Sequence, residues 1–168
     1  RYYNKPYHFS ISLPDAKWKL DYSSRIKQTH TIHFNSPILN KLKLIIRMSH
    51  QVAGDTLGII DVGIILFQKP KSAVELARQS LNDIIKFFPE PDSIVITQNV
   101  TPSGRGKNLS AFYMLELPEE PSVRFPVIIP LFKVRGQTIY VINCYAKYET
   151  YDILKSDFES VLTSLQIY

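Results

Sequence analysis

The sequence of 168 residues lacks a second cysteine and lacks a long uninterrupted apolar run. A lone cysteine, Cys144, excludes an intramolecular disulfide and offers no cysteine-rich metal cluster. The densest apolar stretch, Gly58 to Phe67, contains Asp61 and is far shorter than the ~20 residues of a membrane-spanning helix. We therefore predict one globular domain, residues 1–168, that is stabilised by an apolar core without disulfides or metals.

Catalytic motifs are also missing. The chain has no Gly-x-Ser-x-Gly elbow, and the apolar alternation around Cys144 predicts a buried, inert thiol. His30 and His33 would point to opposite faces of a strand, so that they could not share one metal ion. We therefore expect no catalytic residues, no metal and no cofactor. The alternative is a hydrolase or ligand-processing enzyme whose site forms only in three dimensions.

One segment contains part of a phosphate-binding pattern. Residues 103–107 place two glycines before a lysine, but Lys107 precedes Asn108 and a strand. A Walker loop needs Ser or Thr at that position, followed by a helix. The simplest interpretation is a hairpin tip, and the alternative is weak anion contact through Arg105 and Lys107.

Alternating apolar residues predict a chain dominated by strands. In the clearest case, Gln137 to Lys147, both alternating sets are largely apolar, so we expect a central strand covered on both faces. It follows a tight turn at Arg135 and Gly136. Further strands are expected at residues 7–13, 25–34, 41–48, 59–67, 93–101 and 111–117, from 125 to that turn, and near Trp18. Residues 52–58 are expected to form a loop.

Two helices are expected among these strands. A capping box at residues 72–75 opens the first, which runs to about Phe88. Apolar residues spaced by three and four over 154–165 predict the second, with Thr150 or Asp152 as its N-cap. Strands that outnumber helices and are joined by short turns favour an α+β fold, in which helices pack on a largely antiparallel sheet.

Two segments resemble PsbP-like domains. The first, Phe9 to Trp18, is an alternating strand that ends in Leu-Pro and is followed by tryptophan; the second is the strand from Gly136 with the closing helix Phe158 to Leu165. The PsbP-like superfamily includes an extrinsic photosystem II protein, a Ran-binding nuclear transport factor and bacterial lipoproteins. The resemblance implies an α/β/α sandwich around a central antiparallel sheet and a largely non-enzymatic role.

Positive charge is concentrated in the first part of the chain. Residues 1–50 hold nine Lys and Arg against two Asp, whereas residues 51–168 hold eleven against thirteen acidic residues. If strands 25–34 and 41–48 form an antiparallel hairpin, six basic side chains lie on one outward face. Such a face would suit an acidic protein surface or anionic lipid, or it is simply solvated; nucleic acid is not favoured, because no binding motif accompanies the charge. The six residues are Arg25, Lys27, His33, Lys41, Lys43 and Arg47.

We therefore expect a non-enzymatic binding or accessory domain. The chain begins at Arg1 rather than at methionine. With the PsbP-like resemblance, this start leads to the expectation of an exported protein, secreted or tethered to a membrane through a removed N-terminal segment. An intracellular location is the alternative.

Overall fold

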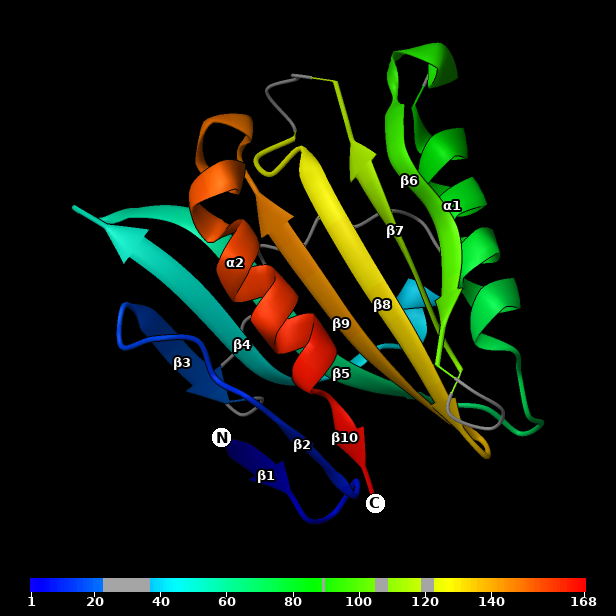
Figure 1. Ribbon diagram of the computed structural model, residues 1–168. Coiled ribbons are helices and arrows are strands. Elements are labelled where there is room, and N and C mark those ends of the chain that lie inside the picture. Colours follow the sequence, from blue (N-terminus) through cyan, green and yellow to red (C-terminus); the bar gives the residue numbers. More distant parts are fainter. Residues whose placement is uncertain (23–36, 89, 105–108, 119–122) are drawn as a thin grey trace.

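The computed structural model describes residues 1–22, 37–88, 90–104, 109–118 and 123–168. At its centre is a seven-stranded sheet in which every neighbouring pair is antiparallel (Figure 1). In spatial order its strands are β3 (Trp18–Tyr22), β4 (Lys43–Val52), β5 (Asp55–Leu66), β9 (Thr138–Ala146), β8 (Val127–Arg135), β7 (Ser110–Glu116) and β6 (Val95–Ser103). The predicted α+β fold is confirmed.

A second, three-stranded sheet joins the two ends of the chain. It contains β1 (Tyr2–Asn4), β2 (Phe9–Ile11) and β10 (Gln166–Ile167), with β2 in the middle. The strand expected over 7–13 is thus shorter, and the sequence analysis missed β1 and β10. Such short strands carry too few residues for a visible alternation.

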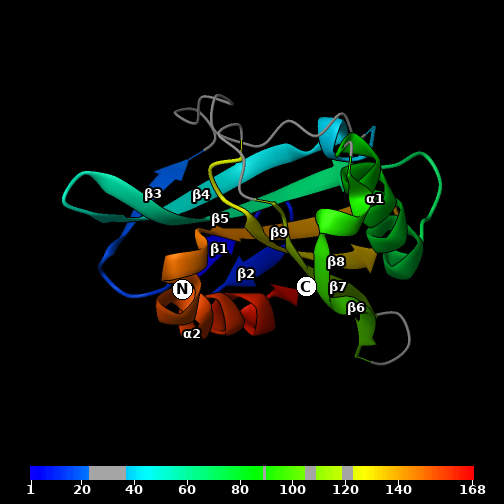
Figure 2. The same ribbon diagram turned by 90° about the horizontal axis from the view of Figure 1, so that it is seen from above.

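The described residues form two α-helices, α1 (Ala73–Phe87) and α2 (Tyr148–Ser164), and two short 3₁₀ segments, η2 (Leu39–Lys41) and η3 (Pro91–Ser93). Figure 2 shows α1 on one side of the large sheet and α2, with the small sheet, on the other. The described part of the chain is therefore an α/β/α sandwich, as expected.

Of the two predicted helix starts, only that of α1 is confirmed. Ser72 caps α1 as predicted, and its side chain accepts a hydrogen bond from the backbone N–H of Glu75. Neither Thr150 nor Asp152 caps α2, because the helix already begins after Lys147. The Thr150 hydroxyl instead donates to the carbonyl of Leu57, at 2.9 Å, and ties α2 to β5.

The alternation in β9 produces two core layers. Ile139 and Val141 pack in the layer beneath α1, whereas Ile142 and Cys144 pack in the layer beneath α2. All four are buried, and β9 is the fourth of the seven strands. The prediction of a central strand covered on both faces is confirmed, and so is the burial of Cys144.

The connection between β4 and β5 differs from the expected loop. A two-residue turn at Ala53 and Gly54, both with positive φ (51° and 90°), joins the strands directly. Tight hairpins favour such backbone angles because they match the twist of the flanking strands, but alanine rarely adopts them. The residues at this turn therefore contain little signal that would predict a hairpin.

A β-bulge interrupts the alternation of β4. The register shifts between Leu44 and Ile46, and Ile45 is the extra residue. Ile45 and Ile46 both pack in the layer beneath α2, which reverses the parity of the strand on either side of the bulge. Lys43 and Arg47 consequently lie on opposite faces of the sheet.

Candidate functional site

On the side that carries α2, the described residues leave one part of the sheet open. The helix packs on β5, β9 and β8, while β6 and β7 lie beyond it (Figure 1). Between α2 and these outer strands runs an open groove of about 550 Å³. We call it the acidic groove; it is lined by Thr97, Gln98, Met114, Glu116, Val127, Tyr148, Tyr151, Asp152, Lys155 and Glu159.

Local periodicity explains why these side chains meet. On β7, Met114 and Glu116 alternate with Tyr113 and Leu115, which pack beneath α1. On α2, the lining residues from 148 to 159 recur at spacings of three and four, which places them on one flank of the helix. The groove therefore lies between one face of β7 and one flank of α2.

The floor and walls of the acidic groove are chemically different. Met114 and Val127 form a buried apolar floor. At the rim, the Thr97 hydroxyl donates to Glu116 Oε1 over 2.6 Å, and the Tyr151 hydroxyl lies 3.5 Å from Met114 Sδ. The groove thus presents hydroxyl and carboxylate groups at its rim, above a floor whose two apolar side chains are almost fully buried.

The charges around the acidic groove oppose the net charge of the protein. Its described lining contains three carboxylates and one ammonium, a formal charge of −2, whereas the whole chain carries +5. Partial burial raises the pKa of Tyr151, and the neighbouring Glu159, Asp152 and Glu116 raise it further by disfavouring the phenolate. The groove therefore has a negative potential that would favour a cation.

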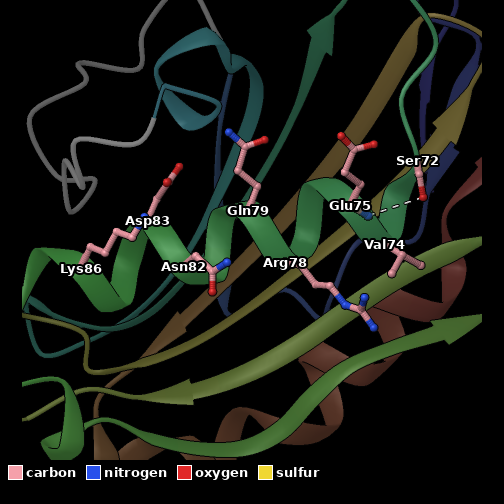
Figure 3. A pocket seen from close by; sticks show the side chains of 8 residues that line it. All are labelled: Ser72, Val74, Glu75, Arg78, Gln79, Asn82, Asp83 and Lys86. Carbon is pink, nitrogen blue, oxygen red and sulfur yellow. Dashed lines mark hydrogen bonds between the residues drawn. The ribbon is translucent and has the colours of Figure 1, made fainter.

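A second hollow lies along the outer surface of α1 (Figure 3). Its described lining consists of Ser72 and seven residues of α1. Figure 3 shows Glu75 and Gln79 pointing to one side of the helix and Arg78 and Asn82 to the other. Because these side chains converge on no common centre, this surface is a weaker candidate than the acidic groove.

A buried ion pair lies in the sheet on the side that carries α1. Arg47 Nε and Nη2 donate to Asp61 Oδ1 and Oδ2, both over 2.7 Å, and the two residues are 6% and 1% exposed. Burial raises the pKa of Asp61, and the hydrogen bonds from Arg47 oppose that rise. Burial would lower the pKa of Arg47, but the hydrogen bonds and charge of Asp61 outweigh it and raise the value. The two parallel N–H···O contacts identify a charged pair.

The predicted basic face does not form as expected on β4. The prediction that Arg47 faces outward is wrong, because its guanidinium is buried against Asp61. Lys43 lies on the other face, where its ammonium donates to the Tyr7 hydroxyl over 2.6 Å. Lys41 is exposed in η2, and its ammonium lies 5.6 Å from the ring centroid of Phe67. The remaining predicted residues, Arg25, Lys27, His33, Arg105 and Lys107, lie outside the described residues, and anion binding stays a prediction.

The described residues offer little to the hydrolase alternative. Cys144 is fully buried, and burial raises the pKa of its thiol well above the ordinary value. No group of three or more His, Cys, Asp or Glu in the described part of the chain could hold a metal ion. The imidazole of His50 is buried edge-on against Trp18, with Nδ1 unpartnered. None of the described helices is long and apolar enough to cross a membrane.

Sequence reasoning missed the acidic groove. The stripe of Tyr148, Asp152, Lys155 and Glu159 at spacings of four, three and four was visible as one flank of the closing helix. Glu116, across the groove, lies more than thirty positions away in the chain. The sequence predicts only that it belongs to a strand. Nothing in the sequence shows that α2 stops short of β7.

The whole architecture is similar to that of a solved structure. Cyanobacterial PsbP (CyanoP) from Synechocystis sp. PCC 6803, a solution structure, superposes with a TM-score of 0.66 over 99% of this chain and 91% of that chain. The chain has a PsbP-like fold. The two sequences are 13% identical, so the likeness is one of fold. No family model matches the sequence, and no curated protein matches it.

Proposed function

We propose that this chain is a non-enzymatic binding domain that holds its partner in the acidic groove. The observation that supports it most is the incomplete cover of the sheet by the described residues: α2 packs on β5, β9 and β8, and the groove lies between it and the outer strands β7 and β6. A concave surface with an apolar floor and a few polar groups at its rim is typical of a binding site. The PsbP-like fold agrees with an accessory role.

The proposal includes a place of action outside the cytoplasm. It follows the PsbP-like resemblance, with secretion or membrane tethering of the full-length precursor as the means. Cell fractionation of the native protein tests it, and recovery in the cytoplasmic fraction alone would contradict it. This part of the proposal is independent of the acidic groove.

Site-specific photocrosslinking tests the groove directly. A photoreactive phenylalanine derivative at Gln98, an exposed groove residue on β6, is compared with the same derivative at Gln79, an exposed residue on α1. In the source cells, a discrete adduct is expected from position 98 and not from position 79. Adducts at both positions, or at position 79 alone, would show that the groove is not the contact surface.

The enzyme alternative has its own measurement. Purified protein is assayed against a panel of ester, phosphoester and peptide substrates, with the double variant Asp152→Asn, Glu159→Gln beside it. The binding proposal predicts no turnover by either protein. Turnover by the parent that is lost in the variant would place an active site in the groove instead.

A further inference from the structure

The described lining of the acidic groove contains three carboxylates at separated positions along its length. Asp152 and Glu159 lie seven residues apart on α2, which corresponds to about 10 Å along the helix axis. Glu116 lies across from them at the end of β7, opposite Val127 of β8 and Val95 of β6. Negative charge is thus distributed along the groove rather than gathered in one spot.

The outer wall of the acidic groove is a strand with a free edge. β6 is the last strand of the seven-stranded order, and its described partner is β7 alone. Most of β6 is exposed, including Val95 and Ile96 at 55% and 38%. A partner segment in extended form would lie in the groove across the exposed side chains of β6 that line it, Thr97 and Gln98, rather than beside the free edge.

The spacing of the carboxylates suits an extended chain with basic residues four apart. Alternate residues of a strand point to the same side, and residues i and i+4 are separated by roughly 13 Å. Long, flexible lysine or arginine side chains can span the difference between that value and the separation of Asp152 and Glu159. The residue between them on the same side would lie over Met114 and Tyr151.

From this geometry we infer that the acidic groove binds an extended basic segment of a partner protein, in which two Lys or Arg side chains flank an apolar one on the side facing the groove. This inference rests on the proposed function and names the chemistry of the partner. Tyr148 and Tyr151 add aromatic faces that attract such cations.

Lys155 leads to a prediction of opposite sign to that for the carboxylates of the same groove. It lies between Asp152 and Glu159 on the flank of α2 that lines the groove, and it is exposed. Its charge would repel a basic segment, whereas the carboxylates would attract one. Removal of this ammonium should therefore strengthen the binding that removal of the carboxylates weakens.

Two methionines make the binding visible with an internal control. The chain contains Met48 and Met114 alone, of which Met48 is fully buried in the core and Met114 lies in the groove floor. Protein labelled at the methionine methyl groups is titrated with a capped peptide of sequence Gly-Lys-Ser-Leu-Ser-Lys-Gly. The Met114 methyl resonance is expected to shift with saturation, and the Met48 resonance is expected to stay in place.

Matched variants then separate charge from folding. The double variant Asp152→Asn, Glu159→Gln should lower the affinity for the peptide about tenfold. The variant Lys155→Gln should raise that affinity about twofold. The control Asp55→Asn, Glu90→Gln removes two exposed carboxylates that do not line the groove and should leave the affinity unchanged. An unchanged Met48 resonance verifies that each variant is folded.

Several outcomes would overturn the inference. A peptide with Glu in place of both Lys should not bind, and equal binding of the two peptides contradicts the charge argument. Equal loss of peptide affinity in the groove and control variants contradicts the assignment of the binding site to the groove. So does a Met114 methyl resonance that does not shift on titration. If position 98 still crosslinks a partner while the basic peptide fails, the proposed function stands and the chemistry assigned to the partner is wrong.

Discussion

On the side of the sheet that carries α1, Arg47 and Asp61 are closed off from solvent and satisfy each other. On the side that carries α2, the carboxylates of Asp152 and Glu159 are exposed at the rim of a groove. A buried pair must keep both partners, because removing one leaves an isolated charge in a medium of low polarity. Exposed charges contribute little to folding and remain available to a partner. Charged residues on the two faces of one sheet therefore have different consequences when they are changed.

The largest expected effect is on the buried pair. Asp61→Ala should destabilise the protein by about 3–5 kcal/mol, because Arg47 would remain buried without a counter-charge. Urea denaturation measures the change. The double variant Arg47→Met, Asp61→Leu should recover much of the loss, and a double variant as unstable as the single one would show that packing rather than charge is responsible.

The next effect tests the apolar packing on the α2 side. Trp18 is 5% exposed, packs edge-on against Phe158, and donates through Nε1 to Asp157 Oδ2 over 2.9 Å. Trp18→Ala should lower the stability by about 3 kcal/mol. Ile153→Ala, at a position 69% exposed on α2, is the control and should stay within about 0.5 kcal/mol of the parent. A shift in thermal midpoint of only a degree or two for Trp18→Ala would contradict its role as a core residue.

An intermediate effect concerns alkaline pH. Burial raises the pKa of Cys144 above its ordinary value of 9.0, and it also raises the pKa of Tyr113 and Tyr145 above 10.0. The folded protein therefore keeps these protons at a pH where the unfolded chain has lost them. Stability from this source is fully present below pH 9 and should fall as the pH rises above it.

Thermal unfolding from pH 7 to pH 11 measures this decline, with Cys144→Ala as the comparison. The variant should lose less stability between pH 8 and pH 10 than the parent, because it no longer contains the thiol. A thiol-reactive dye should also label native protein far more slowly than unfolded protein. Equal labelling rates would mean that Cys144 is accessible and that the two-layer core is wrong.

The smallest expected effect is on the acidic groove itself. Asp152→Asn, Glu159→Gln should change the free energy of unfolding by less than about 0.5 kcal/mol, because both side chains are exposed. Denaturation of this variant and of Asp61→Ala compares how much charged residues on each face of the sheet contribute to stability. A loss of 2 kcal/mol or more in the groove variant would show that these carboxylates stabilise the fold, which would weaken the contrast on which the proposed function depends.

The prediction from sequence was strongest where local pattern decides structure. The two apolar sets of β9 indicated a central strand, and Ser72 with Glu75 indicated the start of α1, because alternation and capping involve residues close together in the chain. It failed at β4, where one extra residue, Ile45, reverses the parity and turns Arg47 inward. A bulge of this kind leaves no signal in an alternation that continues on both sides of it.

For this protein, periodicity was enough to predict both helices, most of the strands and a largely antiparallel sheet with helices packed on it, because a strand or helix must bury one face whatever its partners are. The α/β/α sandwich was implied by the PsbP-like resemblance. The pairing of Arg47 with Asp61 and the meeting of Glu116 with Asp152 and Glu159 depend on which strands are neighbours and on how far α2 extends across the sheet. Such contacts join residues far apart in the chain, and many arrangements satisfy the same local patterns. Only the tertiary structure chooses among them, through the packing of both core layers at once.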